Sequence, residues 1–184
     1  FFKRYATKEL QQFSSPAKDK PKKIEEHRKD PRLTKGPIIV SIDTSGSMSG
    51  QPQRIAFSLL KQLLRMAKKQ KRPCYLISFS VRSKSIDLAK PRNWRMIDNF
   101  LEHSYSGGTD GEQMLAEAIR VLQKGTYEMA DVLIVSDFEF PVPNPSTIEK
   151  IDKEKALGTR FYGLKIGHYG VKYYKHIMDK IWEV

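Results

Sequence analysis

The sequence predicts an α/β fold in which a doubly wound, mostly parallel sheet is flanked by helices. Apolar runs of strand length occur at 38–42, 74–79, 131–136 and 160–166. Between them lie segments in which apolar residues recur every three or four positions, as they do along one face of a helix. Strands that alternate with helices are typical of βαβ units, whose right-handed crossovers place helices on both faces of the sheet.

The remaining elements follow from local patterns. A weaker strand is expected at 85–88, at an edge of the sheet. The first helix is expected to begin at Pro52 and to end in the basic turn 68–71, where cations suit the helix dipole. Its inward face is predicted to hold Ile55, Leu59, Leu63 and Met66, widened by Leu60, Leu64 and Ala67. Further helices are expected at 94–101, 110–122, 146–157 and, closing the chain, 173–182.

Residues 1–35 are predicted to be a leader, with the α/β domain spanning 36–184. Residues 1–13 have a helical stripe that indicates the end of a preceding helical region, and the chain begins without Met, so we expect a fragment of a longer protein. A basic linker follows and gives residues 1–35 half of the net charge of +12. Residues 16–35 could bind nucleic acid or anionic lipid, or could be a solvated linker.

Composition places the chain among cytoplasmic proteins, with peripheral membrane contact left open by the leader. No apolar stretch reaches the roughly 20 residues that a membrane span needs, and no signal peptide is recognised. The single cysteine, Cys74, excludes an internal disulfide and lies in a strand-like run, so we expect a buried and inert thiol.

Polar residues with oxygen ligands follow two of the predicted strands. Asp43, Ser45 and Ser47 come directly after the run 38–42, and Asp137 follows the run 131–136. Thr109 lies in a Gly-Gly-Thr-Asp segment that opens a predicted helix. Because open α/β sheets bind ligands at the carboxyl ends of their strands, these side chains are expected to meet in one divalent-cation site.

This pattern, D-x-S-x-S with a later Thr and a later Asp, resembles the metal-ion-dependent adhesion site of von Willebrand factor A domains. The resemblance covers roughly residues 36–184 and implies a Rossmann-like fold that binds an acidic residue of a partner protein through the metal. Two carboxylates and three neutral hydroxyls leave a cation partly neutralised, so the cation can accept a carboxylate from a partner. Mg²⁺ is the expected ion, with Mn²⁺ as a substitute and Ca²⁺ ranked third because it prefers more ligands.

The neighbours of the metal ligands are expected to form a rim that contacts the partner. This rim comprises Met48, Ser49, Gln51, Tyr105, Ser106, Phe138 and Phe140. The two phenylalanines have an alternative role, packing beneath the proline-rich loop 141–145. Asp110 is expected to cap the helix that follows it, although contact with a metal-bound water is an alternative.

Motifs for catalysis are missing from the sequence. The segment Gly46–Gly50 has Met48 where a nucleophile elbow needs serine, no Walker A phosphate loop is found, and Ser45 replaces the second acid of a D-x-D phosphatase motif. The histidines at 27, 103, 168 and 176 have no metal-ligand spacing. A binding role is therefore favoured, with an Mg²⁺-dependent hydrolase as the alternative.

Six further segments resemble the ViaA family of bacterial proteins. They are Phe2–Arg4, Gly36–Val40, Arg72–Tyr75, Ser106–Asp110, Ser136–Phe138 and Ile177–Trp182. Members of that family combine a helical N-terminal region with a C-terminal A domain and act with RavA, a MoxR-type AAA+ ATPase. The resemblance implies an adaptor or co-chaperone for such an ATPase.

Overall fold

The computed structural model describes residues 35–102, 107–167, 171 and 174–184. The chain divides into two units, Phe1–Thr34 and Lys35–Val184, and every described residue belongs to the second. The predicted helical leader, its basic linker and the suggested contact of residues 16–35 with lipid or nucleic acid therefore lie outside the described residues, apart from Lys35.

Six strands form one mixed, mostly parallel sheet with the order β3-β2-β1-β4-β5-β6. Their bounds are β1 Ile38–Asp43, β2 Cys74–Phe79, β3 Ser83–Asp87, β4 Asp131–Ser136, β5 Arg160–Lys165 and β6 Lys180–Glu183. Only β3, at one edge, runs antiparallel to its neighbour. The predicted α/β class is confirmed, including the weak edge strand, in which Ile86 alone is buried.

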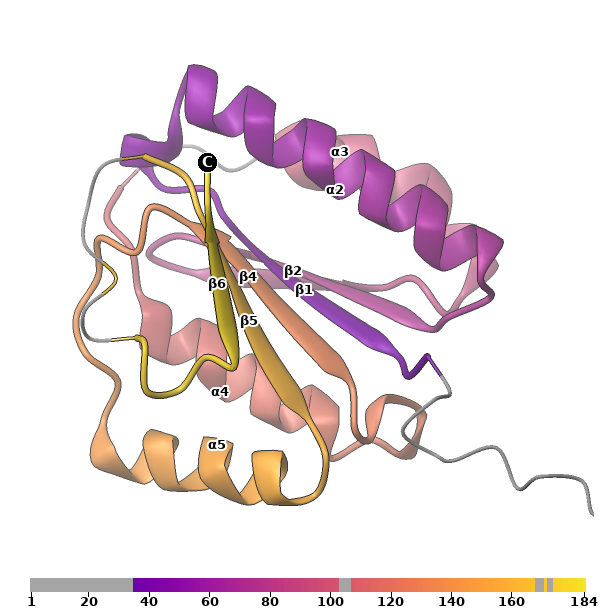
Figure 1. The fold of residues 1–184 in the computed structure, drawn as a ribbon. Helices are drawn as coiled ribbons and strands as arrows, with labels where there is room; N and C mark the ends of the chain where they lie inside the picture. The colour runs from indigo at the N-terminus through magenta and orange to yellow at the C-terminus, as the bar shows by residue number, and fades with distance from the viewer. Residues whose placement is uncertain (1–34, 103–106, 168–170, 172–173) are drawn as a thin grey trace, which may run out of the picture. The chain divides into compact units, whose positions relative to one another are not determined.

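Helices cover both faces of the sheet (Figure 1). They are α2 Gln51–Lys69, α3 Ile97–Glu102, α4 Gly111–Leu122 and α5 Pro145–Ala156, with short 3₁₀ turns at Gly46–Met48, Pro91–Met96 and Gly125–Tyr127. In Figure 1, α2 and α3 lie on one face of the sheet, and α4 and α5 lie on the other. This is the layered arrangement that right-handed βαβ crossovers produce.

Strand β1 contributes to two separate hydrophobic cores. Ile38, Val40 and Ile42 pack with α2, whereas Ile39 packs with α4. Successive side chains of a strand point to opposite faces, so a strand covered on both sides is apolar at nearly every position. This double burial fixes the position of β1 and hence of the loop that follows it.

The predicted closing helix at 173–182 is wrong. Tyr174, Ile177 and Met178 are spaced as in a helix, but the chain makes only one turn there, with Met178 N–H donating to Tyr174 O. Asp179 then exchanges hydrogen bonds with Phe161: its carboxylate accepts from Phe161 N–H at 2.7 Å and its own N–H donates to Phe161 O. This pairing redirects the chain into β6, which runs parallel to β5.

The inward face of α2 also differs from the prediction. Ala56, Leu60, Leu64 and Ala67 are buried, whereas Met66 is 40% exposed. The face is thus rotated away from the predicted stripe, because the two small alanines bring the helix backbone close to the sheet. The largest side chains of the predicted stripe consequently lie at its margins.

Candidate metal centre at the carboxyl ends of β1 and β4

The strand order places β1 at the point where the winding direction of the sheet reverses. The chain proceeds from β1 to β2 on one side, and β4 pairs with β1 on the other. Ligand sites of open α/β sheets lie outside the carboxyl ends of the strands at such a switch point. The register pairs Ile42 with Val135, so the next residues along, Asp43 and Ser136, are neighbours there.

The Asp43 carboxylate is buried and held by two hydrogen bonds. Ser45 N–H donates to Oδ1 at 2.9 Å, and Ser136 Oγ donates to Oδ2 at 2.5 Å. Burial raises the pKa of Asp43 above its ordinary value, the hydrogen bonds from Ser136 and Ser45 oppose that rise, and the nearby negative charge of Asp137 adds to it. The site therefore brings two carboxyl groups together in a partly desolvated place.

No cation of the protein compensates these carboxylates among the residues that the structure describes. The ion pairs found there join other residues, and none includes Asp43 or Asp137. Two neighbouring anions without a counter-charge favour either protonation or a bound cation. The arrangement thus fits an external positive ion.

Two hydroxyl groups lie on the loop beyond Asp43. The Oγ atoms of Ser45 and Ser47 are hydrogen-bonded to each other, 3.0 Å apart, across the 3₁₀ turn Gly46–Met48. Ser45 is buried, and Ser47 is exposed. Each hydroxyl oxygen has two lone pairs, so this bond leaves acceptor capacity for a cation.

Thr109 reaches this edge through backbone hydrogen bonds on either side of it. Gly46 N–H donates to Gly107 O at 3.2 Å, and Asp110 N–H donates to Ser80 O at 2.8 Å, just after β2. Asp110 caps α4, since its Oδ1 accepts from the N–H groups of Glu112 and Gln113. The cap role predicted for Asp110 is confirmed, and Thr109 lies in the loop directly before this cap residue.

Asp137 follows β4 and is fixed by the turn after it. Its Oδ1 accepts from Glu139 N–H at 3.0 Å, and Ser136 Oγ lies 3.4 Å from the same atom. Phe138 has a positive φ of 59°, an uncommon conformation for a bulky residue, and its N–H donates to Ser136 Oγ. The turn holds the Asp137 carboxylate beside that of Asp43.

Ser136 and Thr44 are site residues that the sequence analysis missed. Ser136 Oγ connects both carboxylates. Thr44 Oγ1 contacts Ser78 Oγ at 3.1 Å and Phe79 O at 3.0 Å, which fastens the first loop to β2. A hydroxyl residue in the last position of an apolar strand, next to an aspartate, was the only signal for Ser136.

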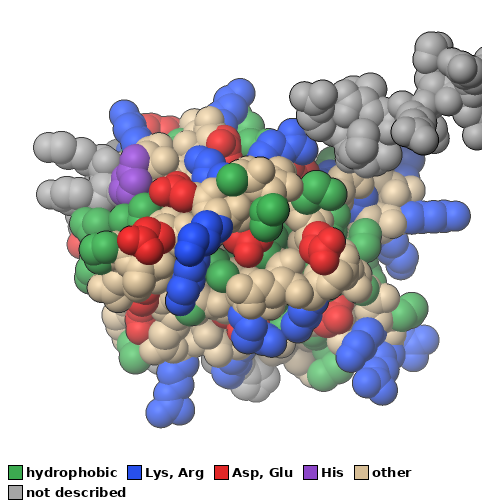
Figure 2. All heavy atoms as spheres, turned by 90° about the horizontal axis from the view of Figure 1, so that it is seen from below, with side chains coloured by type: hydrophobic (Ala, Val, Ile, Leu, Met, Phe, Trp, Pro, Cys, Tyr) green, Lys and Arg blue, Asp and Glu red, His purple; other side chains and the backbone are tan. Residues whose placement is uncertain are grey.

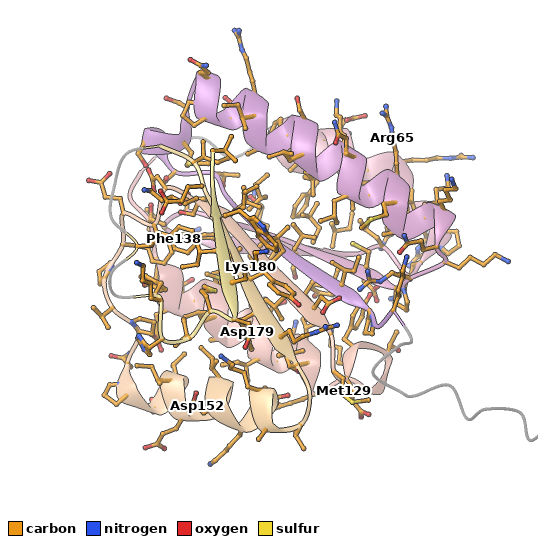
Figure 3. All side chains as sticks on the ribbon, in the orientation of Figure 1. Arg65, Met129, Phe138, Asp152, Asp179 and Lys180 are labelled. Atoms are coloured by element: carbon orange, nitrogen blue, oxygen red, sulfur yellow. The ribbon has the colours of Figure 1, made fainter. Side chains whose placement is uncertain are left out.

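Burial contradicts part of the predicted partner-binding rim. Met48 is fully buried in the core beneath α2 and cannot contact a partner. Phe138 and Phe140 are also buried and pack against each other and against Tyr174, so packing is their role. Figure 3 shows Phe138 within the fold. Ser49 and Gln51 are exposed, and Tyr105 and Ser106 lie outside the described residues.

A hollow of about 230 Å³ opens beside Thr109. It lies between the start of α4 and the proline-rich loop, with Glu112, Pro141, Val142 and Asn144 in its wall. Glu112 holds the two elements together because its carboxylate accepts from Asn144 N–H at 3.0 Å and from the Thr147 hydroxyl. The hollow is therefore bounded by two elements that Glu112 joins.

The donor set suits a hard divalent cation. All five predicted ligands offer oxygen, and in the part of the chain that the structure describes no three His, Cys, Asp or Glu side chains cluster into an alternative metal site. Mg²⁺ is bound through few carboxylates together with hydroxyls and waters, whereas softer metals select imidazole or thiolate. The residues present therefore fit Mg²⁺ or Mn²⁺.

Comparisons with solved structures define the class of this fold. The A domain of a protein from Catenulispora acidiphila superposes with a TM-score of 0.59 at 15% identity, covering 82% of this chain and 38% of that one. The SpRpn10 VWA domain gives a TM-score of 0.59 at 12% identity, covering 81% of this chain and 87% of that one. Proximal thread matrix protein 1 from the mussel byssus, whose metal-ion-dependent adhesion site is occupied by zinc, gives a TM-score of 0.62 at 16% identity. The match covers 82% of this chain and 43% of that one. The chain therefore has the von Willebrand factor A fold.

Sequence comparison finds curated relatives of this chain. The chain is 31% identical over 159 residues to the regulatory protein ViaA of Edwardsiella ictaluri and over 157 residues to that of Proteus mirabilis. Each alignment covers 85% of this chain and 32% of the relative, so the chain spans about a third of the curated relatives that it matches. The predicted resemblance to ViaA is confirmed. No family model matches the chain.

The sequence also predicted a buried thiol at Cys74. Cys74 is buried, and that burial raises its pKa to about 12, as expected for an inert thiol. No helix among the described residues is long and apolar enough to cross a bilayer.

Proposed function

We propose that this chain is a metal-dependent module for regulatory protein interaction, in which Asp43, Ser45, Ser47, Thr109 and Asp137 hold Mg²⁺. The observation that supports it most strongly is the hydrogen bond from Ser136 to Asp43, which brings two uncompensated carboxylates together beside the hydroxyls of Ser45 and Ser47. When bound, the metal supplies an open coordination position for a carboxylate of the partner.

The protein's own residues define what that partner meets. Ser47, Ser49 and Gln51 are exposed around the first loop and can donate or accept hydrogen bonds. On the other side, the hollow at Thr109 receives the residue next to the partner's Asp or Glu. By similarity to the ViaA regulatory proteins, we infer a cytoplasmic adaptor or co-chaperone for a MoxR-type AAA+ ATPase, and binding rather than catalysis.

Calorimetry tests the metal site directly. Titration with MgCl₂ and MnCl₂ should give one site in the wild-type chain and none in Asp43→Ala, because that change removes a central ligand. Asp152→Ala is the matched control, since Asp152 is an exposed acid on α5 (Figure 3). Equal Mg²⁺ binding by wild type and Asp43→Ala would refute the site.

A pull-down tests the partner. The wild-type chain as bait, in Mg²⁺ and in EDTA, is compared with Asp43→Ala in Mg²⁺, and bound proteins are identified by mass spectrometry. Retention of an AAA+ ATPase only by wild type in Mg²⁺ is expected. Retention under all three conditions would show that the partner binds another surface. Metal-dependent phosphoester hydrolysis by the purified chain would instead support the hydrolase alternative.

A further inference from the structure

The charge of the domain is strongly polarised along the sequence. Residues 51–96 contain twelve Lys or Arg and a single acid, Asp87, a net charge of +11. The rest of 36–184 has a net charge of −5. Residues 51–96 include α2, β3 and the turn Pro91–Met96, so twelve of the 22 Lys and Arg residues of 36–184, with a single acid among them, belong to the α2 side of the fold and its adjoining edge.

These cations are not neutralised within the described part of the chain. Of the twelve, only Arg72 forms an ion pair there, with Asp131 at 2.6 Å. Asp87 is already occupied, because its Oδ1 accepts from Tyr127 OH and from Ala89 N–H. By contrast, Figure 2 views the fold from the α5 side and shows acidic side chains distributed among basic ones.

Exposed cations of α2 form a stripe along one side of the helix. Arg54, Lys61, Arg65, Lys68 and Lys69 are all exposed, and their spacing of seven, four and three or four residues places them on one side of the helix. Figure 3 shows Arg65 pointing away from the sheet. The stripe begins at the first turn of α2, next to the metal centre, and extends roughly 22 Å at 1.5 Å per residue.

A hollow of about 250 Å³ lies at the far end of this stripe. Its apolar wall is made by Ala67, Pro73, Leu88, Ala89 and Trp94, and Lys68 and Lys71 line it as well. Trp94 is held in place because its Nε1–H donates to Leu88 O at 2.8 Å, while Lys68 Nζ lies 5.5 Å from the ring centroid. The hollow thus combines an apolar wall with the cations of Lys68, Lys71 and the ion-paired Arg72.

We propose that the α2 stripe and this hollow form a second, metal-independent docking surface for an acidic protein segment that carries one apolar anchor residue. Acidic side chains would pair with the stripe, and the anchor would enter the hollow beside Trp94. A nucleic acid fits less well, because its backbone would use only the cations, and Lys68 already occupies a face of Trp94 where a base would stack. The proposal goes beyond the metal-dependent function and does not rest on it.

Fluorescence anisotropy with defined probes tests this surface on the whole chain in EDTA. The probes are a labelled 16-residue peptide of Glu and Asp with one central Leu, the same peptide with Ser replacing Leu, a 16-nucleotide poly-U RNA, and vesicles containing an anionic phospholipid. The Leu peptide is expected to bind most tightly of the four at equal ionic strength. Tighter binding of RNA or vesicles, equal binding of the two peptides, or no peptide binding would overturn the proposal.

Paired charge reversals locate the binding. Arg65→Glu/Lys68→Glu should weaken the Leu peptide about tenfold, since two contacts become repulsive. Lys150→Glu/Lys153→Glu makes the same charge change on exposed lysines of α5 and should alter the Kd less than about twofold. Thermal unfolding of each variant checks that the fold is kept. Equal weakening by both pairs would refute a localised surface.

A third variant tests the hollow. Ala89 is exposed at its wall, so Ala89→Gln should partly fill it and weaken the Leu peptide about fivefold while leaving the Ser peptide unchanged. Asp43→Ala should bind both peptides as the wild type does, which separates this surface from the metal centre. Loss of peptide binding in Asp43→Ala would overturn the metal-independent assignment.

Discussion

The Ser136 hydroxyl donates a 2.5 Å hydrogen bond to Oδ2 of Asp43, joining the last residue of β4 to the last residue of β1. The same oxygen accepts the N–H of Phe138 and lies 3.4 Å from Oδ1 of Asp137. One hydroxyl therefore orients both carboxylates of the candidate metal centre. Removing a group that orients a metal ligand in this way typically weakens metal affinity about 10- to 100-fold.

Ser136→Ala is predicted to weaken Mg²⁺ binding about 10- to 100-fold, because Asp43 loses the bond that fixes its carboxylate. Calorimetric titration of MgCl₂ measures the change. Ser146→Ala, an exposed serine on α5, should bind Mg²⁺ as the wild type does. If both variants kept wild-type affinity, Ser136 would not position the ligand.

Phe140→Ala is predicted to lower the free energy of unfolding by about 3 kcal/mol, as expected when a buried aromatic ring is removed. The ring packs against Phe79, Phe138 and Tyr174 with centroid distances of 4.9–5.9 Å. Urea unfolding measures the loss. Val142→Ala, on the same loop but 48% exposed, should cost less than about 0.5 kcal/mol. If Phe140→Ala barely changed the free energy of unfolding, the original prediction that Phe140 belongs to the partner-binding rim would be favoured instead.

Arg72→Ala is predicted to cost about 2 kcal/mol, a typical value for losing hydrogen bonds made by a charged group. The guanidinium is largely buried and donates to Gly36 O at 2.5 Å and to Asp131 Oδ2 at 2.6 Å. Arg160 also pairs with Asp131, at 3.0 Å, but is 53% exposed, so Arg160→Ala should cost less than about 1 kcal/mol. Similar losses in urea unfolding of the two variants would contradict this difference.

Cys74 is predicted to react slowly with Ellman's reagent at pH 8 in the folded protein and rapidly in urea. Burial raises its pKa to about 12, so the reactive thiolate is scarce at pH 8. Because the folded pKa exceeds the thiol's ordinary value of 9.0, the thiol's contribution to stability is complete below pH 9 and falls as pH rises toward 12.

A surface thiol provides the control for this measurement. Ser146→Cys adds an exposed cysteine on α5, which should give one rapidly reacting thiol per folded chain. Rapid reaction of Cys74 in the folded wild-type protein would contradict its predicted inertness.

The parallel strands and the helices between them were predictable because their signals are local. Strand β1 is apolar at successive positions since both of its faces are covered, and α4 begins at Gly111 since Asp110 caps it. The helix predicted at 173–182 from local spacing was wrong for a physical reason. The pairing of Asp179 with Phe161 is a contact over 18 residues that no helical period reveals.

The sequence by itself determined the α/β class, the likeness to A domains and the position of oxygen-bearing side chains after β1 and β4, because strand ends and residue types can be recognised in short stretches of sequence. The tertiary structure alone decided which neighbours of those ligands are accessible. Phe138 and Phe140 follow Asp137 as rim residues would, yet Gly163 and Gly111 leave the space their rings fill: a Cβ at Gly111 would lie 2.3 Å from the Phe140 ring. Such packing joins residues far apart in the chain, so it could be known only from the fold.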